Sequence, residues 1–229
     1  MTNIIVTIIA VVIGGLLNMV VAVWAEHRRQ ANLRPNIREP DDADLLLNGA
    51  SVGQFRSLKI QVMNVPSGWL GKWMRSPALQ ARALVSFHRV ADGREIFGRR
   101  MEGRWANSLQ PTPTPVVDTN GNVSLFIHDP ERLSAGSRVD IYPGESALLD
   151  VAVRFQGDTD CYGWNNETYF AQPYGKNPSW RLASGVFLVK VTITSTGRKC
   201  EGVFRLINDV PYDAFRLEPA SDGEIARVS

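Results

Sequence analysis

Thirteen residues, DTDCYGWNNETYF (158–170), gather the side chains of this chain that could do chemistry. The segment opens as DxD, the way a calcium-binding loop opens, but Tyr162 and Tyr169 stand where that loop needs an oxygen ligand and a bidentate glutamate. A looser cation site would use the remaining oxygen ligands, which are Asp158, Asp160, Asn165 and Glu167. We favour the alternative, a polar loop whose Asp and Asn side chains bond their own backbone. We therefore assign no metal ligand.

The aromatic half of the same region is richer in rings than a spacer needs. Tyr and Trp at this density are typical of binding surfaces, where a few aromatic side chains carry most of the affinity. The same rings could instead fold back as a cap over the open end of a sandwich. Both interpretations stay open, and we take these residues as candidate partner contacts: Tyr162, Trp164, Tyr169, Phe170 and Trp180.

A second aromatic segment, PSGWLGKWMRS (66–76), places Trp69 and Trp73 one helical turn apart. Such a face could dip into a lipid leaflet or seat a partner helix. It could equally plug a gap at the edge of the sandwich. Trp69 and Trp73 complete the set of candidate partner contacts.

No motif of catalysis or cofactor binding accompanies these segments. Neither HxxxH nor CxxC occurs, and GxSxG, the P-loop and GxGxxG are missing as well. His88 and His128 are expected on the solvent-facing side of strands. Cys161 and Cys200 could form one bridge or remain two thiols. The sequence therefore assigns no catalytic residue, no cofactor and no metal.

The elements that would position these loops are strands. Apolar residues alternate with polar ones in LKIQVMN, ARALVSFHRV, NVSLFIH, RVDIY, LLDVAVRF, VFLVKVTIT and GVFRLIN, as in half-buried strands. Asp92-Gly93, Asn120-Gly121 and Pro143-Gly144 are turn signals between them. We expect an all-β fold over residues 51–218, an antiparallel sandwich of about seven to nine strands.

The N-terminus has a different character. Ile4 to Ala25 holds 22 residues without a charge, and an apolar helix of about 20 residues crosses a bilayer. A signal peptide is disfavoured, because the run is too long and no basic residue precedes it. We expect residues 1–25 to form one transmembrane α-helix, with Trp24 at the membrane edge.

The charges that flank this helix predict its orientation. Arg28 and Arg29 follow it closely at the membrane edge, and no Lys or Arg precedes it, so the N-terminus is expected outside and the C-terminal domain in the cytoplasm. Residues 26–50 are expected to be a juxtamembrane linker and residues 219–229 a flexible tail. The net charge of +2 argues against a nucleic-acid partner.

The order of these patterns resembles a known domain type. LKIQVMNV, then ADGREI, then IYPGESALLDVAVRF and the final pair GVFLVKVTIT and GVFRLIN look like the immunoglobulin-like domains of uncharacterised prokaryotic membrane-anchored proteins, over about residues 52–210. The resemblance implies a recognition or scaffold module and transfers no catalytic residue. The chain departs from it at Trp164, which follows Cys161 by only three positions, so the disulfide of immunoglobulin domains is not carried over.

Together these observations predict a single-pass cell-membrane protein whose β-sandwich binds or scaffolds a partner. Its role would be that of an accessory or sensor component of a membrane complex, with the lipid bilayer and a protein as partners. A hydrolase or metal-dependent enzyme that uses residues 158–180 is the alternative.

Overall fold

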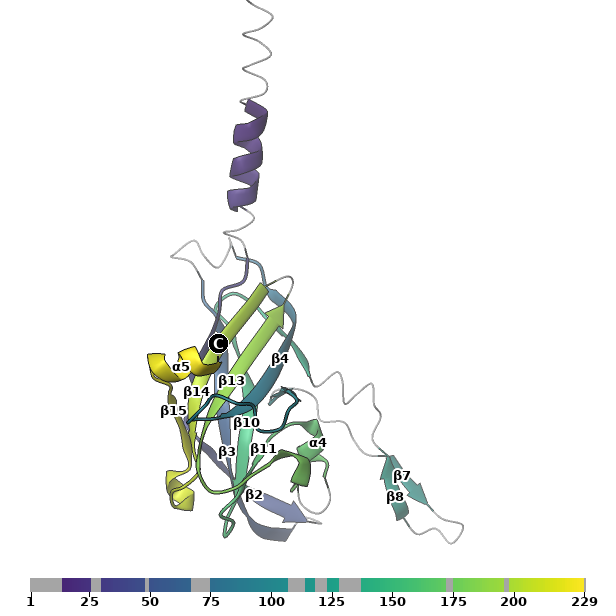
Figure 1. The fold of residues 1–229 in the computed structure, drawn as a ribbon. Coiled ribbons are helices and arrows are strands. Elements are labelled where there is room, and N and C mark those ends of the chain that lie inside the picture. Colours follow the sequence, from purple (N-terminus) through teal and green to yellow (C-terminus); the bar gives the residue numbers. More distant parts are fainter. Residues whose placement is uncertain are drawn as a thin grey trace, which may run out of the picture.

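The computed structural model describes most of the chain, namely residues 14–25, 30–47, 50–66, 75–106, 114–117, 123–127, 137–171, 175–195 and 198–228. Within these residues two antiparallel sheets pack face to face as a β-sandwich (Figure 1). The predicted fold class, an antiparallel β-sandwich, is confirmed at this level.

The first sheet is built around two long strands. Its members are β1 (Leu33–Ile37), β2 (Asp41–Leu47), β3 (Ala50–Asn64), β6 (Arg104–Trp105), β10 (Ser146–Phe155), β11 (Cys161–Gly163) and β12 (Arg181–Leu182). They follow the order β1-β3-β10-β11-β12, with β2 beside β3 and β6 beside β10.

The second sheet contains β4 (Ala78–Arg89), β5 (Met101–Glu102), β9 (Arg138–Ile141), β13 (Val186–Ser195), β14 (Arg198–Ile207) and β15 (Arg216–Pro219). Its order is β15-β14-β13-β4-β5, with β9 beside β4. The β13–β14 hairpin is regular over its whole length, from Val186↔Ile207 to Ser195↔Arg198.

The core lies between the two sheets, where the alternating apolar residues meet. Leu58, Ile60 and Val62 of β3 are at most 1% exposed, and Ala83, Val85 and Phe87 of β4 are fully buried. Lys59 and Gln61, which alternate with the β3 residues, and Arg82, which precedes Ala83, are more exposed. The period-two pattern therefore identified the buried faces of these strands correctly.

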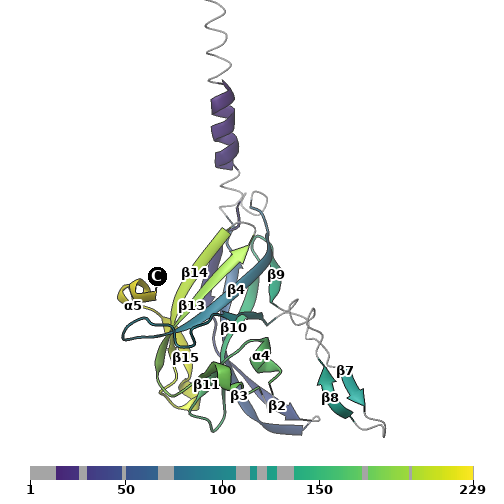
Figure 2. The ribbon, with the colours of Figure 1, turned by 45° about the vertical axis from the view of Figure 1, so that its right-hand side comes forward.

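One predicted strand lies outside the sandwich. Residues 122–128 contain β8 (Val123–Ile127), which pairs only with β7 (Thr114–Val117) in a separate two-stranded sheet. Figures 1 and 2 both draw this hairpin apart from the two packed sheets. The remaining short elements are α4 (Asn166–Tyr169), α5 (Asp222–Val228), η1 (Pro178–Trp180) and η2 (Tyr212–Ala214).

The segments expected as linker and tail carry ordered structure. Residues 26–50 include β1 and β2, and Pro35 fits because β1 is an edge strand, where proline is tolerated. Residues 219–229 include α5, which is held to the sandwich where Lys190 Nζ donates to the Val228 carbonyl at 2.9 Å. The sequence did not predict β1, β2 and α5, because proline and aspartate are unfavourable in regular strands and in helix interiors.

The N-terminal segment is helical over residues 14–25, and Figure 1 shows that helix extending away from the sandwich. The other residues of the predicted anchor, 1–13, and the linker arginines Arg28 and Arg29 lie outside the described residues. In the part of the chain that the structure describes, no helix combines the length and the apolar character that crossing a membrane requires.

A β-bulge in β10 changes which face its side chains meet. Asp150 pairs with Lys59 and Ala152 pairs with Leu58, so Val151 is an extra residue on the β10 side. Before the bulge, Leu149 packs in the inter-sheet core, whereas after it Val153 and Phe155 join a second cluster. The bulge therefore splits one alternating sequence between the inner and outer faces of the sheet.

Asp150 itself is buried beside this bulge and forms an ion pair with Arg104 of β6. Its side chain is 1% exposed and that of Arg104 is 9% exposed. Arg104 also lies over the ring of Tyr169, with 4.2 Å between the guanidinium carbon and the ring centroid. Burial raises the pKa of Asp150 to about 6, against the opposing attraction of Arg104.

This pKa predicts how stability depends on pH. Between about pH 4 and pH 6 the folded chain keeps a proton on Asp150 that the unfolded chain has released, so the contribution of Asp150 to the free energy of unfolding falls as pH rises. The whole effect amounts to about 3 kcal/mol. In Asp150→Asn this decline should disappear, as measured by urea unfolding at several pH values.

Asp42→Asn is the matched control. The hydrogen bond from Arg56 lowers the pKa of Asp42, so its stabilising contribution is lost only as pH falls below about 4. Asp42→Asn should therefore show the same change in the free energy of unfolding between pH 4 and pH 6 as the wild type. If the free energy of unfolding of Asp150→Asn still declined with pH as in the wild type, Asp150 would not be the group responsible.

Candidate functional site

Tyr162, Trp164 and Tyr169 of the chemistry-bearing segment 158–180 fold against the outer face of the first sheet, whereas Cys161 and Trp180 pack in the inter-sheet core. Trp164 packs on Phe55 and Phe155, with ring centroids 5.9 and 6.4 Å apart, and on Tyr169 at 5.6 Å. Val153 and Tyr162 complete the buried members of this outer cluster. The segment therefore covers apolar side chains that the bulge in β10 turns away from the main core.

Burial separates the predicted contact residues into groups. Trp164 and Tyr162 are 6% and 8% exposed and form a folded-back cap, whereas Trp180 is 1% exposed within the inter-sheet core. All three side chains therefore offer little surface to a partner. Tyr169 and Phe170 are partly exposed, with their ring centroids 4.9 Å apart. Contact with a partner stays a prediction for these two. Trp69 and Trp73 lie outside the described residues.

The oxygen ligands of the segment bind its own side chains. Asp158 pairs with Lys176 at 2.6 Å, and Asp160 accepts from Arg181 Nε at 2.5 Å. Glu167 Oε2 accepts from the Trp180 indole at 2.8 Å.

Asn165 caps α4, because its Oδ1 accepts from the Thr168 amide at 2.9 Å. Nowhere in the described residues do three or more His, Cys, Asp or Glu side chains gather as a metal site would need. These contacts fit a polar loop rather than a cation site.

The two thiols are unpaired. Cys161 is buried in the inter-sheet core, and burial raises the pKa of its thiol. Cys200 is half-buried and donates to the Leu33 carbonyl at 3.1 Å, and burial raises its pKa as well. Raised pKa values keep both thiols protonated, so neither has the thiolate character of a reactive cysteine.

His88 is buried, not solvent-facing as the alternation predicted. Its Nε2 lies 2.8 Å from Ser86 Oγ and its Nδ1 lies 2.9 Å from the Gly93 carbonyl. A carbonyl oxygen only accepts, so Nδ1 carries a proton and donates to the Gly93 carbonyl. The Gly93 carbonyl thus orients the imidazole, and the side chains of His88 and Ser86 are both at least nine-tenths buried. Its partners make it a structural group of β4. His128 lies outside the described residues.

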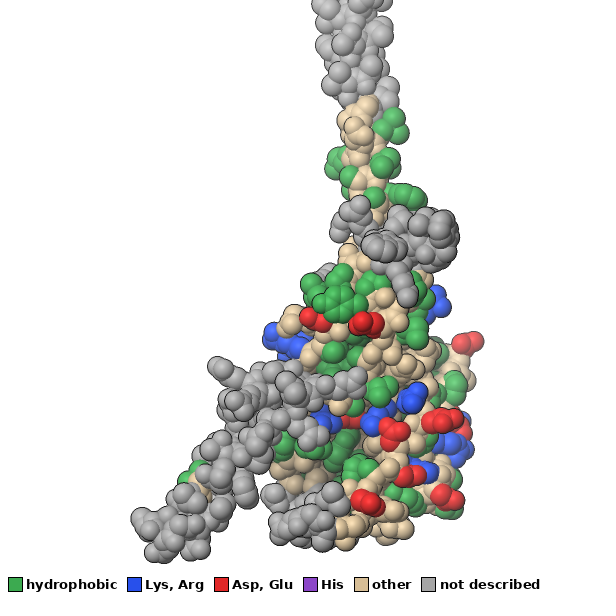
Figure 3. All heavy atoms as spheres, turned by 180° about the vertical axis from the view of Figure 1, so that it is seen from behind, with side chains coloured by type: hydrophobic (Ala, Val, Ile, Leu, Met, Phe, Trp, Pro, Cys, Tyr) green, Lys and Arg blue, Asp and Glu red, His purple; other side chains and the backbone are tan. Residues whose placement is uncertain are grey.

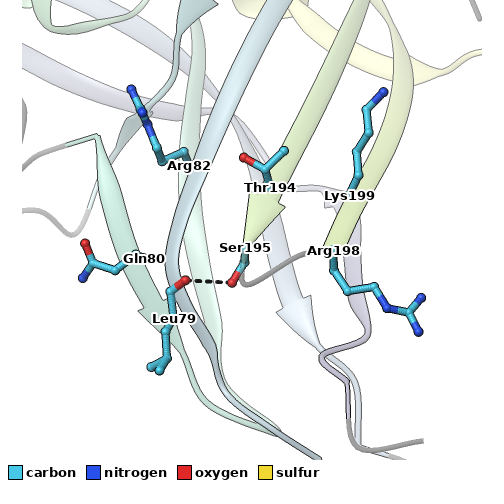
Figure 4. A pocket seen from close by; sticks show the side chains of 7 residues that line it. All are labelled: Leu79, Gln80, Arg82, Thr194, Ser195, Arg198 and Lys199. Carbon is cyan, nitrogen blue, oxygen red and sulfur yellow. Dashed lines mark hydrogen bonds between the residues drawn. The ribbon is translucent and has the colours of Figure 1, made fainter. Parts of the chain in front are cut away.

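A pocket of about 440 Å³ opens at the end of the sandwich nearest the N-terminal helix, which we call the helix-proximal end. Its lining residues are Leu79, Gln80, Arg82, Thr194, Ser195, Arg198 and Lys199 (Figure 4). Three of these seven are cations and none is acidic. The composition suits an anionic group such as phosphate or carboxylate.

Local backbone geometry shapes this pocket. Gln80 has φ +51°, the one non-glycine residue with positive φ among the described residues. It lies in a bulge between Ala78 and Ala81, and its amide donates to Asp140 Oδ1 at 2.7 Å. Ser195 Oγ donates to the Leu79 carbonyl at 2.8 Å, which fixes the other side of the bulge (Figure 4). Such a conformation costs about 1–3 kcal/mol and persists only where neighbours hold it.

Cations line up across the strands beside the pocket. Arg138 of β9 pairs with Arg82 of β4, Arg82 with Thr194 of β13, and Thr194 with Lys199 of β14. Directly paired residues share one face of a sheet, so these four side chains form a row on the outer face of the second sheet, which we call the basic row. Figure 4 shows Arg82 and Lys199 on either side of Thr194.

The charges of the basic row are only partly balanced. Arg82 pairs with Glu102 and Lys199 with Glu201, both at 2.6 Å, and the hydrogen bond from Lys199 lowers the pKa of Glu201. Arg138 forms no ion pair within the described part of the chain. Like charges placed opposite each other, as in Arg138 and Arg82, are unfavourable unless an anion lies between or near them.

The sequence did not predict the basic row, because the row depends on the pairing register of four strands. Arg82, Thr194 and Lys199 each occupy a polar position in an alternating strand, which the sequence does reveal. Only the pairing of β9, β4, β13 and β14 brings them to the same level, and these strands come from residues 78–207.

We predict that the aromatic cluster stabilises the fold. Replacing Trp164 by Ala should lower the free energy of unfolding by about 3–5 kcal/mol, because a large buried side chain leaves a cavity. Phe170→Ala, in the same segment but partly exposed, should cost less than about 1 kcal/mol. Urea unfolding of both variants measures the difference. Equal, small losses would favour a binding surface over a cap.

No family model, no curated protein and no solved structure matches the chain. The resemblance to immunoglobulin-like domains therefore extends as far as the two-sheet sandwich.

Proposed function

We propose that the protein is a single-pass membrane-anchored β-sandwich that binds or scaffolds a partner protein beside the membrane. It would act as an accessory or sensor component of a membrane complex. The N-terminal segment is the anchor, and the body lies on the cytoplasmic side.

The exposed apolar surface of the N-terminal helix carries this proposal. Its seven large hydrophobic side chains are 56–66% exposed, and they are Leu16, Leu17, Met19, Val20, Val21, Val23 and Trp24. The rest of the described chain has four exposed large hydrophobic residues, namely Leu79, Val116, Tyr142 and Ile225. Figure 3 shows hydrophobic side chains along the visible side of the helix. Water disfavours an apolar helix of this kind, whereas lipid accepts it.

The sequence around this helix supports the same interpretation. The uncharged run continues from Ala25 back to Ile4, and Trp24 stands at its end with Arg28 and Arg29 beyond. Basic residues remain on the cytoplasmic side of a membrane, which favours a cytoplasmic body. A cytoplasmic body also suits two free thiols in a reducing compartment.

A binding role suits the body better than an enzymatic one. The acidic side chains on which the enzyme alternative depends, Asp158, Asp160 and Glu167, are engaged in ion pairs and hydrogen bonds with Lys176, Arg181, Arg99 and Trp180. Tyr169 and Phe170 remain partly exposed beside them. These rings are the surface that we propose for the protein partner.

The anchor is tested by extraction from membranes. Wild-type protein should stay in the membrane pellet at alkaline pH, whereas Leu16→Arg/Val20→Arg should be released, because each arginine costs about 2.5–3.5 kcal/mol within a spanning helix. Gln156→Arg/Ser184→Arg, at exposed positions of the sandwich, should behave like wild type. Release of the wild-type chain would contradict the anchor.

The orientation needs a separate measurement. A fluorescent protein fused after Ser229 should fold and fluoresce, whereas alkaline phosphatase at the same position should stay inactive, because that enzyme needs an oxidising compartment for its disulfides. The reverse pattern would place the sandwich outside the cytoplasm.

A further inference from the structure

We propose that the helix-proximal end of the sandwich docks onto anionic phospholipid headgroups of the leaflet next to it. The contact surface consists of the basic row, the pocket beside it and two exposed hydrophobic side chains. This inference rests on the proposed membrane anchor and adds a second, electrostatic contact with the same membrane.

The chain keeps this end close to the membrane. Gln30 lies five residues after Ala25, the last described residue of the N-terminal helix. It is held to the sandwich by Arg75, whose Nη1 donates to its carbonyl at 3.0 Å, and by Arg198, which donates to its side chain. Five residues span at most about 18 Å. If residue 25 lies at the bilayer surface, Gln30 is within about 18 Å of it, and Arg198 of the pocket lining contacts Gln30.

The charges at this end fit an anionic surface. The cations are Arg34, Arg75, Arg82, Arg138, Arg198 and Lys199, and the acidic residues nearby are Glu102, Asp140, Glu145 and Glu201. Asp140 is engaged with the Gln80 amide. The side chains of Arg82 and Lys199 are 50% and 59% exposed, and ion pairs that exposed are weak, so lipid phosphates can compete with Glu102 and Glu201.

Exposed hydrophobic side chains lie at the same end. Leu79 and Tyr142 are 39% and 51% exposed, and Leu79 lies in the bulge that lines the pocket. Figure 3 shows hydrophobic side chains gathered on the sandwich just below the helix. Tyrosine and an aliphatic side chain among arginines is the composition of membrane–water interfaces. A lipid surface accounts for both features, whereas a soluble anion accounts only for the charge.

Acetylation of Lys199 tests the docking. The full chain is placed in nanodiscs of phosphatidylcholine, or of phosphatidylcholine mixed with phosphatidylglycerol, and treated with a lysine-acetylating reagent, and mass spectrometry follows each lysine. We expect Lys199 to react several-fold more slowly in the phosphatidylglycerol discs. Lys176, which pairs with Asp158 at the opposite end of β10, should react equally in both.

A pair of charge-matched variants makes the test specific. Arg82→Gln/Arg138→Gln should remove the protection of Lys199, since each cation near an anionic surface contributes roughly five-fold to binding. Arg94→Gln/Arg216→Gln removes the same charge from the end of the sandwich away from the helix and should keep the protection. High salt should weaken the protection in the wild-type chain.

The outcomes separate docking from anchoring. Equal Lys199 reactivity in both discs, with the chain retained in each, would overturn the docking and leave the anchor intact. A chain that leaves the discs would overturn both. In a final experiment, inorganic phosphate is added to the phosphatidylcholine discs. If it slows the acetylation of Lys199 as much as phosphatidylglycerol does, the site binds a soluble anion and the lipid assignment is overturned.

Discussion

Strand β10 is buried on both of its faces over its second half, and much of the sandwich follows from that constraint. Its inner side chains meet the second sheet, and after the bulge Val153 and Phe155 point to the other side. An apolar outer face must be covered, and the segment 158–180 covers it with Trp164 and its neighbours. What looked in the sequence like a loop rich in binding residues is largely the cover that β10 requires.

The same bulge explains where the buried ion pair lies. Asp150 precedes the extra residue and so points outward, toward Arg104 and the ring of Tyr169. A buried pair of this kind adds little net stability, because desolvation offsets the attraction, and here it connects β6 to β10 beside the Tyr169 ring of α4. The pair thereby fixes the polar boundary between the inter-sheet core and the outer cluster.

Sequence patterns predicted the sandwich because alternation depends only on neighbouring residues. Ile60 and Val85 were placed on the buried face by period two alone. The same rule assigned Leu149 and Phe155 to one face, and the bulge between them sent them to different clusters. Because Pro35 argued against regular structure, the edge strand β1 was not predicted. The basic row was not predicted either, because it depends on the register of four strands, which no local sequence pattern reveals.

The two outer faces of the sandwich therefore suit two different contacts. Tyr169 lies over Arg104, which pairs with Asp150 near the middle of β10, so Tyr169 and Phe170 belong to the outer face of the first sheet. The basic row lies on the outer face of the second sheet, and the packed core separates the two surfaces. If the helix-proximal end rests on lipid headgroups, the rigid sandwich holds the two rings at a set height from the membrane. Docking of the basic row would then orient the partner surface on the other sheet, because the sandwich between them is packed throughout.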